Sequence, residues 1–148
     1  MRLVVDSSIS LKWWLDDEEF TEEARLLLKK IIDGEIELII PELWYYEVAN
    51  GITTAVRRKR ITEEDGMMFV EELQSIPASL CEIIPNIKKT YQDAVKYQHA
   101  IYDMAYLTVA ELENIQFITG DEKLINTVAD TKLFVKHISG LKYFPYMP

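Results

Sequence analysis

Two acidic residues stand directly after short apolar runs that are typical of buried strands. Asp6 follows residues 2–5, and Asp121 follows residues 115–119 and a glycine. In an open parallel sheet, ligands bind beyond the carboxyl ends of the strands, where the strand order reverses. If these two strands are neighbours at that point, we expect both carboxylates to face one crevice.

Two further acids fall on the apolar faces of predicted helices. Glu47 lies three residues after Trp44, within an apolar stripe that continues with Val48. Asp103 has apolar neighbours on its face at positions 100, 104 and 107. A carboxylate among apolar side chains is costly unless a counter-charge or a metal ion accompanies it. Two such acids, with two more at strand ends, indicate that the four belong to one site.

Each acid alone also has a simpler interpretation. Asp6 or Asp121 would be a helix N-cap or a turn residue. Glu47 or Asp103 would belong to a helix edge or a buried salt bridge. A shared site is the interpretation that explains all four acids together, and we adopt it.

Four crowded carboxylates repel one another unless cations neutralise them. Oxygen ligands of this kind suit Mg²⁺ or Mn²⁺, and such ions activate water and stabilise the leaving oxygen of a phosphodiester. Zinc would be expected to recruit histidine or cysteine. His99 and His137 are expected to be surface or partly buried residues and not ligands.

The composition is that of an ordinary globular protein. The 148 residues are 49% hydrophobic and 28% charged, without a linker or repeat, so we expect a single domain over residues 1–148. No apolar run approaches the roughly 20 residues that cross a bilayer, and one cysteine excludes an intrachain disulfide, which favours a cytoplasmic protein without a membrane anchor. The net charge of −9 argues against general affinity for nucleic acid and suits divalent cations or a basic partner.

Strand and helix patterns alternate along the chain. Ser7 or Ser8 is predicted to cap the first helix, Gly34 to end the second, Pro41 to stop the second strand and Thr62 to cap the fourth helix. The predicted strands are residues 2–6, 36–40, 80–84, 115–119 and 133–138, and the predicted helices are 9–15, 19–33, 42–60, 62–76, 86–98, 101–113 and 122–129. This order predicts an α/β fold with three layers, α/β/α, around a central parallel sheet of four or five strands.

Four segments resemble the ordered motifs of PIN-domain nucleases. They are residues 4–8 (VVDSS), 46–50 (YEVAN), 102–107 (YDMAYL) and 119–124 (TGDEKL). The resemblance covers nearly the whole chain. This short, single-domain form of the family is similar to the VapC toxins of prokaryotic toxin–antitoxin pairs. It implies Mg²⁺- or Mn²⁺-dependent endonucleolytic cleavage of RNA, a homodimer, and inhibition by a cognate antitoxin protein.

The resemblance also implies functions for individual residues. Direct or water-mediated metal ligands would be Asp6, Glu47 and Asp103, and the fourth acid, acting through water, would be Asp121. Supporting polar side chains that position carboxylates or water would be Ser7, Asn50 and Thr119.

A dense basic cluster follows the predicted helix that carries Glu47. It consists of Arg57, Arg58, Lys59 and Arg60. These side chains would bind phosphates that flank the scissile bond, or they would complement the negative end of the helix. Both interpretations stay open at the level of sequence.

Two other classes of protein compete with a metal-dependent ribonuclease. A phosphoryl-binding domain, receiver-like or phosphatase-like, also carries an acid after its first strand. A haloacid-dehalogenase-like phosphatase would have a second acid where this chain has Ser8, and a receiver would have paired acids within residues 3–5, which are apolar. A noncatalytic domain with an acidic pocket would show no stabilisation by metal.

Overall fold

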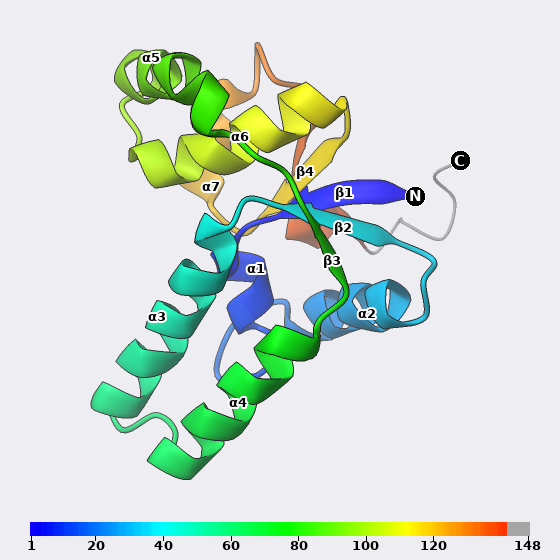
Figure 1. Ribbon diagram of the computed structural model, residues 1–148, viewed down its shortest axis with the longest axis vertical. Coiled ribbons are helices and arrows are strands. Elements are labelled where there is room, and N and C mark those ends of the chain that lie inside the picture. The colour runs from blue at the N-terminus through cyan, green and yellow to red at the C-terminus, as the bar shows by residue number, and fades with distance from the viewer. Residues whose placement is uncertain (142–148) are drawn as a thin grey trace.

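A five-stranded parallel sheet forms the centre of the computed structural model, which describes residues 1–141 (Figure 1). The strands lie in the order β3-β2-β1-β4-β5, and every pairing is parallel. Their bounds are β1 (Arg2–Val5), β2 (Glu37–Ile40), β3 (Ala78–Leu80), β4 (Gln116–Thr119) and β5 (Val135–His137). The predicted α/β class and strand number are confirmed.

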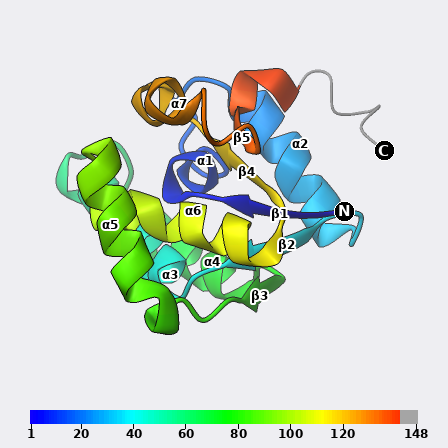
Figure 2. The ribbon, with the colours of Figure 1, turned by 90° about the horizontal axis from the view of Figure 1, so that it is seen from above.

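Helices cover both faces of this sheet, which gives the three predicted layers. Below it in Figure 1 lie α1 (Ser7–Leu11), α2 (Thr21–Ile32), α3 (Leu43–Arg57) and α4 (Glu63–Ser75). Above it lie α5 (Ile87–Tyr97), preceded by the 3₁₀ turn η1 (Ile84–Asn86), and α6 (Ile101–Glu113). The last helix, α7 (Glu122–Val128), packs beside β5. Figure 2 shows α6 over the strands with α5 beside it.

The central strands and α6 form the interior. Leu3, Val4 and Val5 of β1 are completely buried because helices cover both faces of the sheet. Residues 104–110 of α6 are all buried as well, since this helix lies between the sheet and α5. No helix within residues 1–141 has the length and apolar character needed to cross a membrane.

Most helix and strand ends follow the local signals in the sequence. Gly34 adopts a φ of 76° directly after α2, a conformation that glycine reaches without strain. Thr62 caps α4 in a capping box with Asp65, and Pro41 follows β2. The third strand was predicted at residues 80–84 and is wrong in position: β3 ends at Leu80, because its pairing with β2 runs from Ala78 to Leu80.

The first helix also differs from its prediction. Its N-cap is Asp6, and neither Ser7 nor Ser8, because Asp6 Oδ1 accepts a hydrogen bond from the Ile9 N–H at 3.2 Å. The α-helix ends at Leu11 and not at position 15. The backbone N–H groups of residues 12–14 donate to the carbonyl three residues earlier, as in a 3₁₀ turn, and not to the carbonyl four residues earlier. The acid that ends β1 therefore also begins α1.

Candidate active site

The carboxyl ends of β1 and β4 lie side by side at the point where the strand order reverses. β2 and β3 extend the sheet on one side of β1, and β4 and β5 extend it on the other. The register pairs Val5 with Ile118, so the next residues, Asp6 and Thr119, are also neighbours. Ligand crevices of parallel sheets form at such a switch point.

Asp6 is held by hydrogen bonds to both of its carboxylate oxygens. Oδ1 accepts from the Ser8 hydroxyl and from the Ile9 N–H, and Oδ2 accepts from the Thr119 hydroxyl. Burial raises the pKa of Asp6, the three hydrogen bonds oppose that shift, and the charge of Asp103 adds to it. The carboxylate is thus fixed in place by hydrogen bonds in surroundings that disfavour its charge.

The same two hydroxyls connect Asp6 to the loop after β4. Thr119 Oγ1 accepts from the Asp121 N–H at 3.0 Å, and Ser8 Oγ accepts from the Gly120 N–H at 3.1 Å. A Cβ added at Gly120 would lie 3.2 Å from Ser8 Oγ, so the close approach of the two segments suits a glycine. The positions of Asp6 and Asp121 are coupled through these contacts.

Glu47 reaches the site from α3 and is half-buried. Tyr106 of α6 donates a hydrogen bond to its Oε2. Burial raises the pKa of Glu47, the Tyr106 hydrogen bond lowers it, and the charges of Asp103 and Asp6 raise it. Glu47 therefore shares one electrostatic environment with both aspartates.

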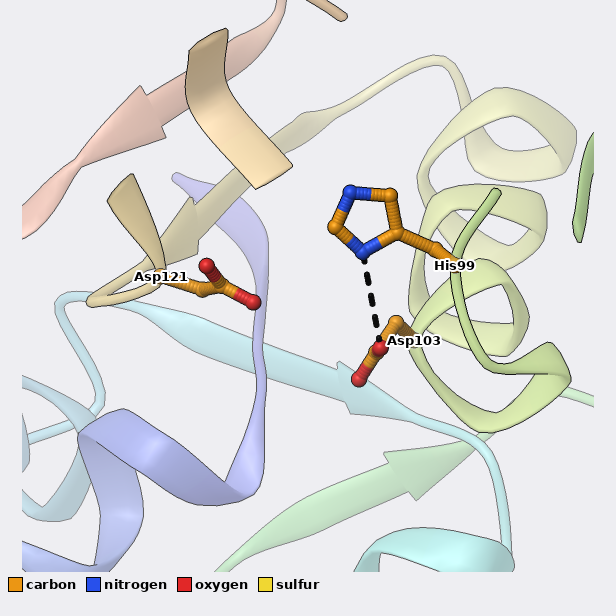
Figure 3. Close-up of side chains that lie close together, drawn as sticks. All are labelled: His99, Asp103 and Asp121. Carbon is orange, nitrogen blue, oxygen red and sulfur yellow. Dashed lines mark ion pairs between the residues drawn. The ribbon is translucent and has the colours of Figure 1, made fainter. Parts of the chain in front are cut away.

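The remaining acids lie at the N-terminal ends of two helices. Asp103 lies in the first turn of α6, and Asp121 caps α7 by accepting the Leu124 N–H at 3.0 Å. Burial raises the pKa of Asp103 and the charge of Asp121 raises it further, whereas His99 and Lys123 lower it. His99 Nδ1 lies 3.8 Å from Asp103 Oδ2 (Figure 3). The charge of Asp103 thus acts on Asp6 and Glu47, and that of Asp121 acts on Asp103, but among the described residues only Asp103 and Asp121, with His99, offer ligand atoms close enough to share one ion.

Comparison with known proteins identifies the family of the chain. Residues 3–130 match the PIN domain family. The chain belongs to this family. It is 29% identical over 129 residues to Ribonuclease VapC3 of Pyrobaculum aerophilum, covering 84% of this chain and 92% of that protein. Ribonuclease VapC12 of Mycobacterium tuberculosis is 26% identical over 122 residues, with 82% and 88% covered.

A solved structure shares the fold of this PIN domain. The crystal structure of PAE2754 from Pyrobaculum aerophilum superimposes with a TM-score of 0.68 and covers 97% of each chain at 19% sequence identity. The three-layer architecture is therefore that of a known protein structure.

The side chains of this PIN domain fit a divalent cation. His99, Asp103 and Asp121 each offer a ligand atom, and these atoms lie within 4.8 Å of one another. Bonds of about 2.1 Å to one ion place its ligand atoms up to about 4.2 Å apart, so small side-chain rotations suffice. The raised pKa values of Asp6 and Asp103 show the repulsion and desolvation that a bound cation would relieve.

The three predicted supporting residues have different surroundings. Thr119 contacts Asp6 directly. The Ser7 hydroxyl interacts with the hydroxyl of Tyr106 and not with an acid of the site. Asn50 is exposed one turn after Glu47, and its side chain has no hydrogen bond within residues 1–141.

The basic cluster, residues 57–60, lies at the end of α3 that points away from the sheet (Figure 1). All four side chains are exposed at this end. The Arg60 guanidinium donates from Nε to Asp17 at 2.8 Å and from a terminal nitrogen to Glu18 at 2.7 Å. Arg60 therefore joins α3 to the segment between α1 and α2.

Three residues at the site were missed in the sequence. Ser8 stands two positions after Asp6, a spacing at which its hydroxyl could have been expected to contact the acid. Tyr106 lies three positions after Asp103 and so on the same face of α6, but its apolar neighbours favoured a core position. His99 precedes the helix of Asp103, and no local pattern directs its ring toward the acids.

Proposed function

We propose that this PIN domain is a metal-dependent endoribonuclease and the toxin of a type II toxin–antitoxin pair. The observation that supports the proposal is that the charges of Asp6, Glu47 and Asp103 act on one another near the switch point of the sheet and that the charge of Asp121 acts on Asp103. The substrate class is taken from the relatives named Ribonuclease VapC3 and Ribonuclease VapC12.

In this proposal Asp6, Glu47 and Asp103 hold Mg²⁺ or Mn²⁺, and Asp121 completes the site through water. When bound, the ion lowers the pKa of a coordinated water and stabilises the oxygen that leaves the phosphodiester. The protein contributes rigid positioning: Thr119 fixes one oxygen of Asp6, and Tyr106 fixes one oxygen of Glu47.

The proposed partners are an RNA substrate, a cognate antitoxin protein and a second copy of the chain, in the cytoplasm. A net charge of −9 favours a basic antitoxin segment, because opposite charges accelerate and orient association. A phosphoryl-accepting aspartate is not favoured, because position 8 holds a serine and residues 3–5 are apolar, where a phosphatase or a receiver would carry further acids.

Substitution of the acids tests this function. Asp6→Asn and Asp103→Asn should each abolish Mn²⁺-dependent cleavage of RNA, while circular dichroism shows an intact fold, since asparagine keeps an oxygen that can cap a helix. Glu71→Gln, an exposed acid on α4, is the matched control and should cleave like wild type. Full activity of either site variant would overturn the assignment.

A second measurement distinguishes the noncatalytic alternative. Binding to the native state raises its stability by mass action, so Mn²⁺ should raise the thermal midpoint of wild type and of Glu71→Gln. A midpoint that is insensitive to metal would favour a structural function for the acids. Co-purification with the protein encoded by the adjacent gene tests whether that protein is the antitoxin. Sequencing of the cleaved RNA ends identifies the cut site.

A further inference from the structure

His99 places a buried imidazole at the edge of the acidic site. Only 4% of its side chain is exposed, and its Nδ1 lies 3.8 Å from Asp103 Oδ2. Figure 3 shows the ring beside the carboxylates of Asp103 and Asp121, which come from different helices. One ligand atom from each of these three residues lies within 4.8 Å of the other two.

Hydrogen bonds on the far side of the ring determine which nitrogen carries the proton. His99 Nε2 lies 3.3 Å from Thr127 Oγ1. The Thr127 hydroxyl donates its own hydrogen to the Lys123 carbonyl at 2.8 Å, so its oxygen can only accept from Nε2. In a neutral ring the hydrogen is therefore on Nε2, and the lone pair of Nδ1 faces Asp103.

In this neutral form the Nδ1 lone pair and the Asp103 carboxylate oxygen are two acceptors facing each other, whereas a protonated ring would pair with Asp103. The separation of 3.8 Å is too long for a hydrogen bond, but it matches two ligands of one cation. In metal sites, the second ring nitrogen of a ligating histidine usually donates to an oxygen that fixes the tautomer and the ring orientation. Thr127 has this position relative to His99.

We propose that His99, Asp103 and Asp121 form a nitrogen-containing site for a divalent first-row transition metal, with His99 Nδ1 as a ligand and Thr127 as its positioning residue. The proposal rests on the proposed function, because both aspartates belong to the same metal centre. It replaces the expectation that neither histidine is a ligand. Imidazole suits transition metals, whereas Mg²⁺ prefers oxygen ligands and water, so the site selects Mn²⁺ over Mg²⁺.

Pulsed electron paramagnetic resonance of the untagged protein loaded with Mn²⁺ tests the direct bond. Coordinated imidazole adds a nitrogen hyperfine coupling to the Mn²⁺ signal. We expect this coupling in wild type and in His137→Gln, and its loss in His99→Gln. His137 is the matched control because the chain has two histidines and the His137 ring is engaged by Ser139.

Calorimetric titration supplies the second readout. His99→Gln should weaken Mn²⁺ binding by about tenfold or more and Mg²⁺ binding by less than about twofold, and Thr127→Val should weaken Mn²⁺ binding by about tenfold. Equal Mn²⁺ affinity in Thr127→Val and wild type would contradict the positioning function of Thr127. If His99→Gln fails to fold, the comparison of wild type with His137→Gln still tests the ligand. Coupling kept in His137→Gln would support His99 as the ligand, and coupling lost in His137→Gln would show that His137 binds the ion and overturn the proposal.

The two proposals fail in different ways. A wild-type protein that cleaves RNA with Mn²⁺ but shows no nitrogen coupling would overturn the His99 ligand alone, leaving a protonated His99 paired with Asp103. A protein that shows the coupling but no cleavage would overturn the ribonuclease function and keep the metal site.

Discussion

Tyr106 donates a hydrogen bond to Glu47 across an interval of 59 residues. The contact joins α6 to α3, which lie in different helical layers (Figure 1). The Tyr106 ring stacks on Phe117 of β4 with centroids 5.9 Å apart, so packing fixes the hydroxyl in place. Burial, and then Glu47 itself, raise the pKa of Tyr106, so it remains a donor at neutral pH. Tyr106 is thus a positioning residue for Glu47.

Tyr106→Phe should impair metal binding more than folding. The ring packing is kept, but the pKa of Glu47 should rise further. In wild type the Tyr106 hydrogen bond stabilises the charged carboxylate, and the variant lacks this bond. We expect Mn²⁺ affinity and the cleavage rate at subsaturating Mn²⁺ to fall about tenfold. The free energy of unfolding of the metal-free protein should fall by only about 1 kcal/mol. Calorimetric titration and denaturant unfolding measure the two effects.

Tyr91→Phe is the control for this change. Tyr91 is exposed on α5, and removal of its hydroxyl should leave the Mn²⁺ affinity as in wild type. Wild-type affinity in Tyr106→Phe as well would show that Glu47 needs no donor to hold its position.

The stability of the metal-free protein should fall as pH rises from the ordinary carboxyl range toward neutrality. Asp6, Glu47 and Asp103 have pKa values raised above 3.8 for aspartate and 4.5 for glutamate, with burial as the largest cause. A carboxyl with a raised folded-state pKa stabilises the fold fully below its unfolded pKa and loses that contribution as pH rises through the folded value. Thermal denaturation in a chelator, over a series of pH values, measures the trend.

Asp6→Asn isolates the contribution of one carboxyl to this trend. An asparagine cannot titrate, so the loss of stability with rising pH should be smaller in the variant than in wild type. Saturating Mn²⁺ should oppose the trend in wild type, because the ion binds the deprotonated acids. An Asp6→Asn protein with the wild-type pH dependence would mean that Asp6 has an ordinary pKa.

The sequence was sufficient to locate the acids at strand ends. Asp6 and Asp121 follow short apolar runs, and the alternation of strands with helices orients those strands in parallel. The edge at which the acids lie follows from these two features. The short β3 strand was misplaced because residues 79 and 80 are exposed, so the apolar pattern there does not mark the paired segment.

Contacts between distant segments could not be derived in the same way. The Tyr106 side chain lies on a fully buried stretch of α6, where an apolar pattern accounts for it without a partner. His99 follows Gln98, whose φ of 53° ends α5, so helical spacing does not place His99 on one face with Asp103. The partners of these side chains depend on how the layers pack.

Ser10 connects the site to the core and should be sensitive to substitution. Its hydroxyl accepts the Trp44 indole N–H at 2.8 Å and donates to the Asp6 carbonyl at 3.0 Å, and both Ser10 and Trp44 are fully buried. Ser10→Ala leaves the indole N–H unpaired and should lower the free energy of unfolding by about 1–3 kcal/mol in denaturant titration. Ser75→Ala, an exposed control, should cost less than about 0.5 kcal/mol. A Ser10→Ala protein as stable as wild type would mean that the indole finds another acceptor.

The structure divides the basic cluster into two parts. Arg60 pairs with Asp17 and Glu18, and its pKa is raised above its usual value by the hydrogen bonds to these two acids. Residues 57–59 are exposed at the same end of α3. If the cluster binds RNA, residues 57–59 are the ones whose charges are available for phosphates. Arg60, which is paired with two acids, is the control.

Reversal of Arg57 and Arg58 to glutamate tests whether these residues bind RNA phosphates. If each contacts one phosphate of a single strand, the slope of log affinity against log salt should become shallower by about 1.4, since each contact contributes about 0.7. Fluorescence anisotropy with an Asp103→Asn protein, which does not consume the RNA, measures this slope. Arg60→Ala should leave the slope as in the parent protein, because its guanidinium is already paired with acids. An unchanged slope in the Arg57/Arg58 variant would reject phosphate binding, and the cluster would then complement the negative end of α3.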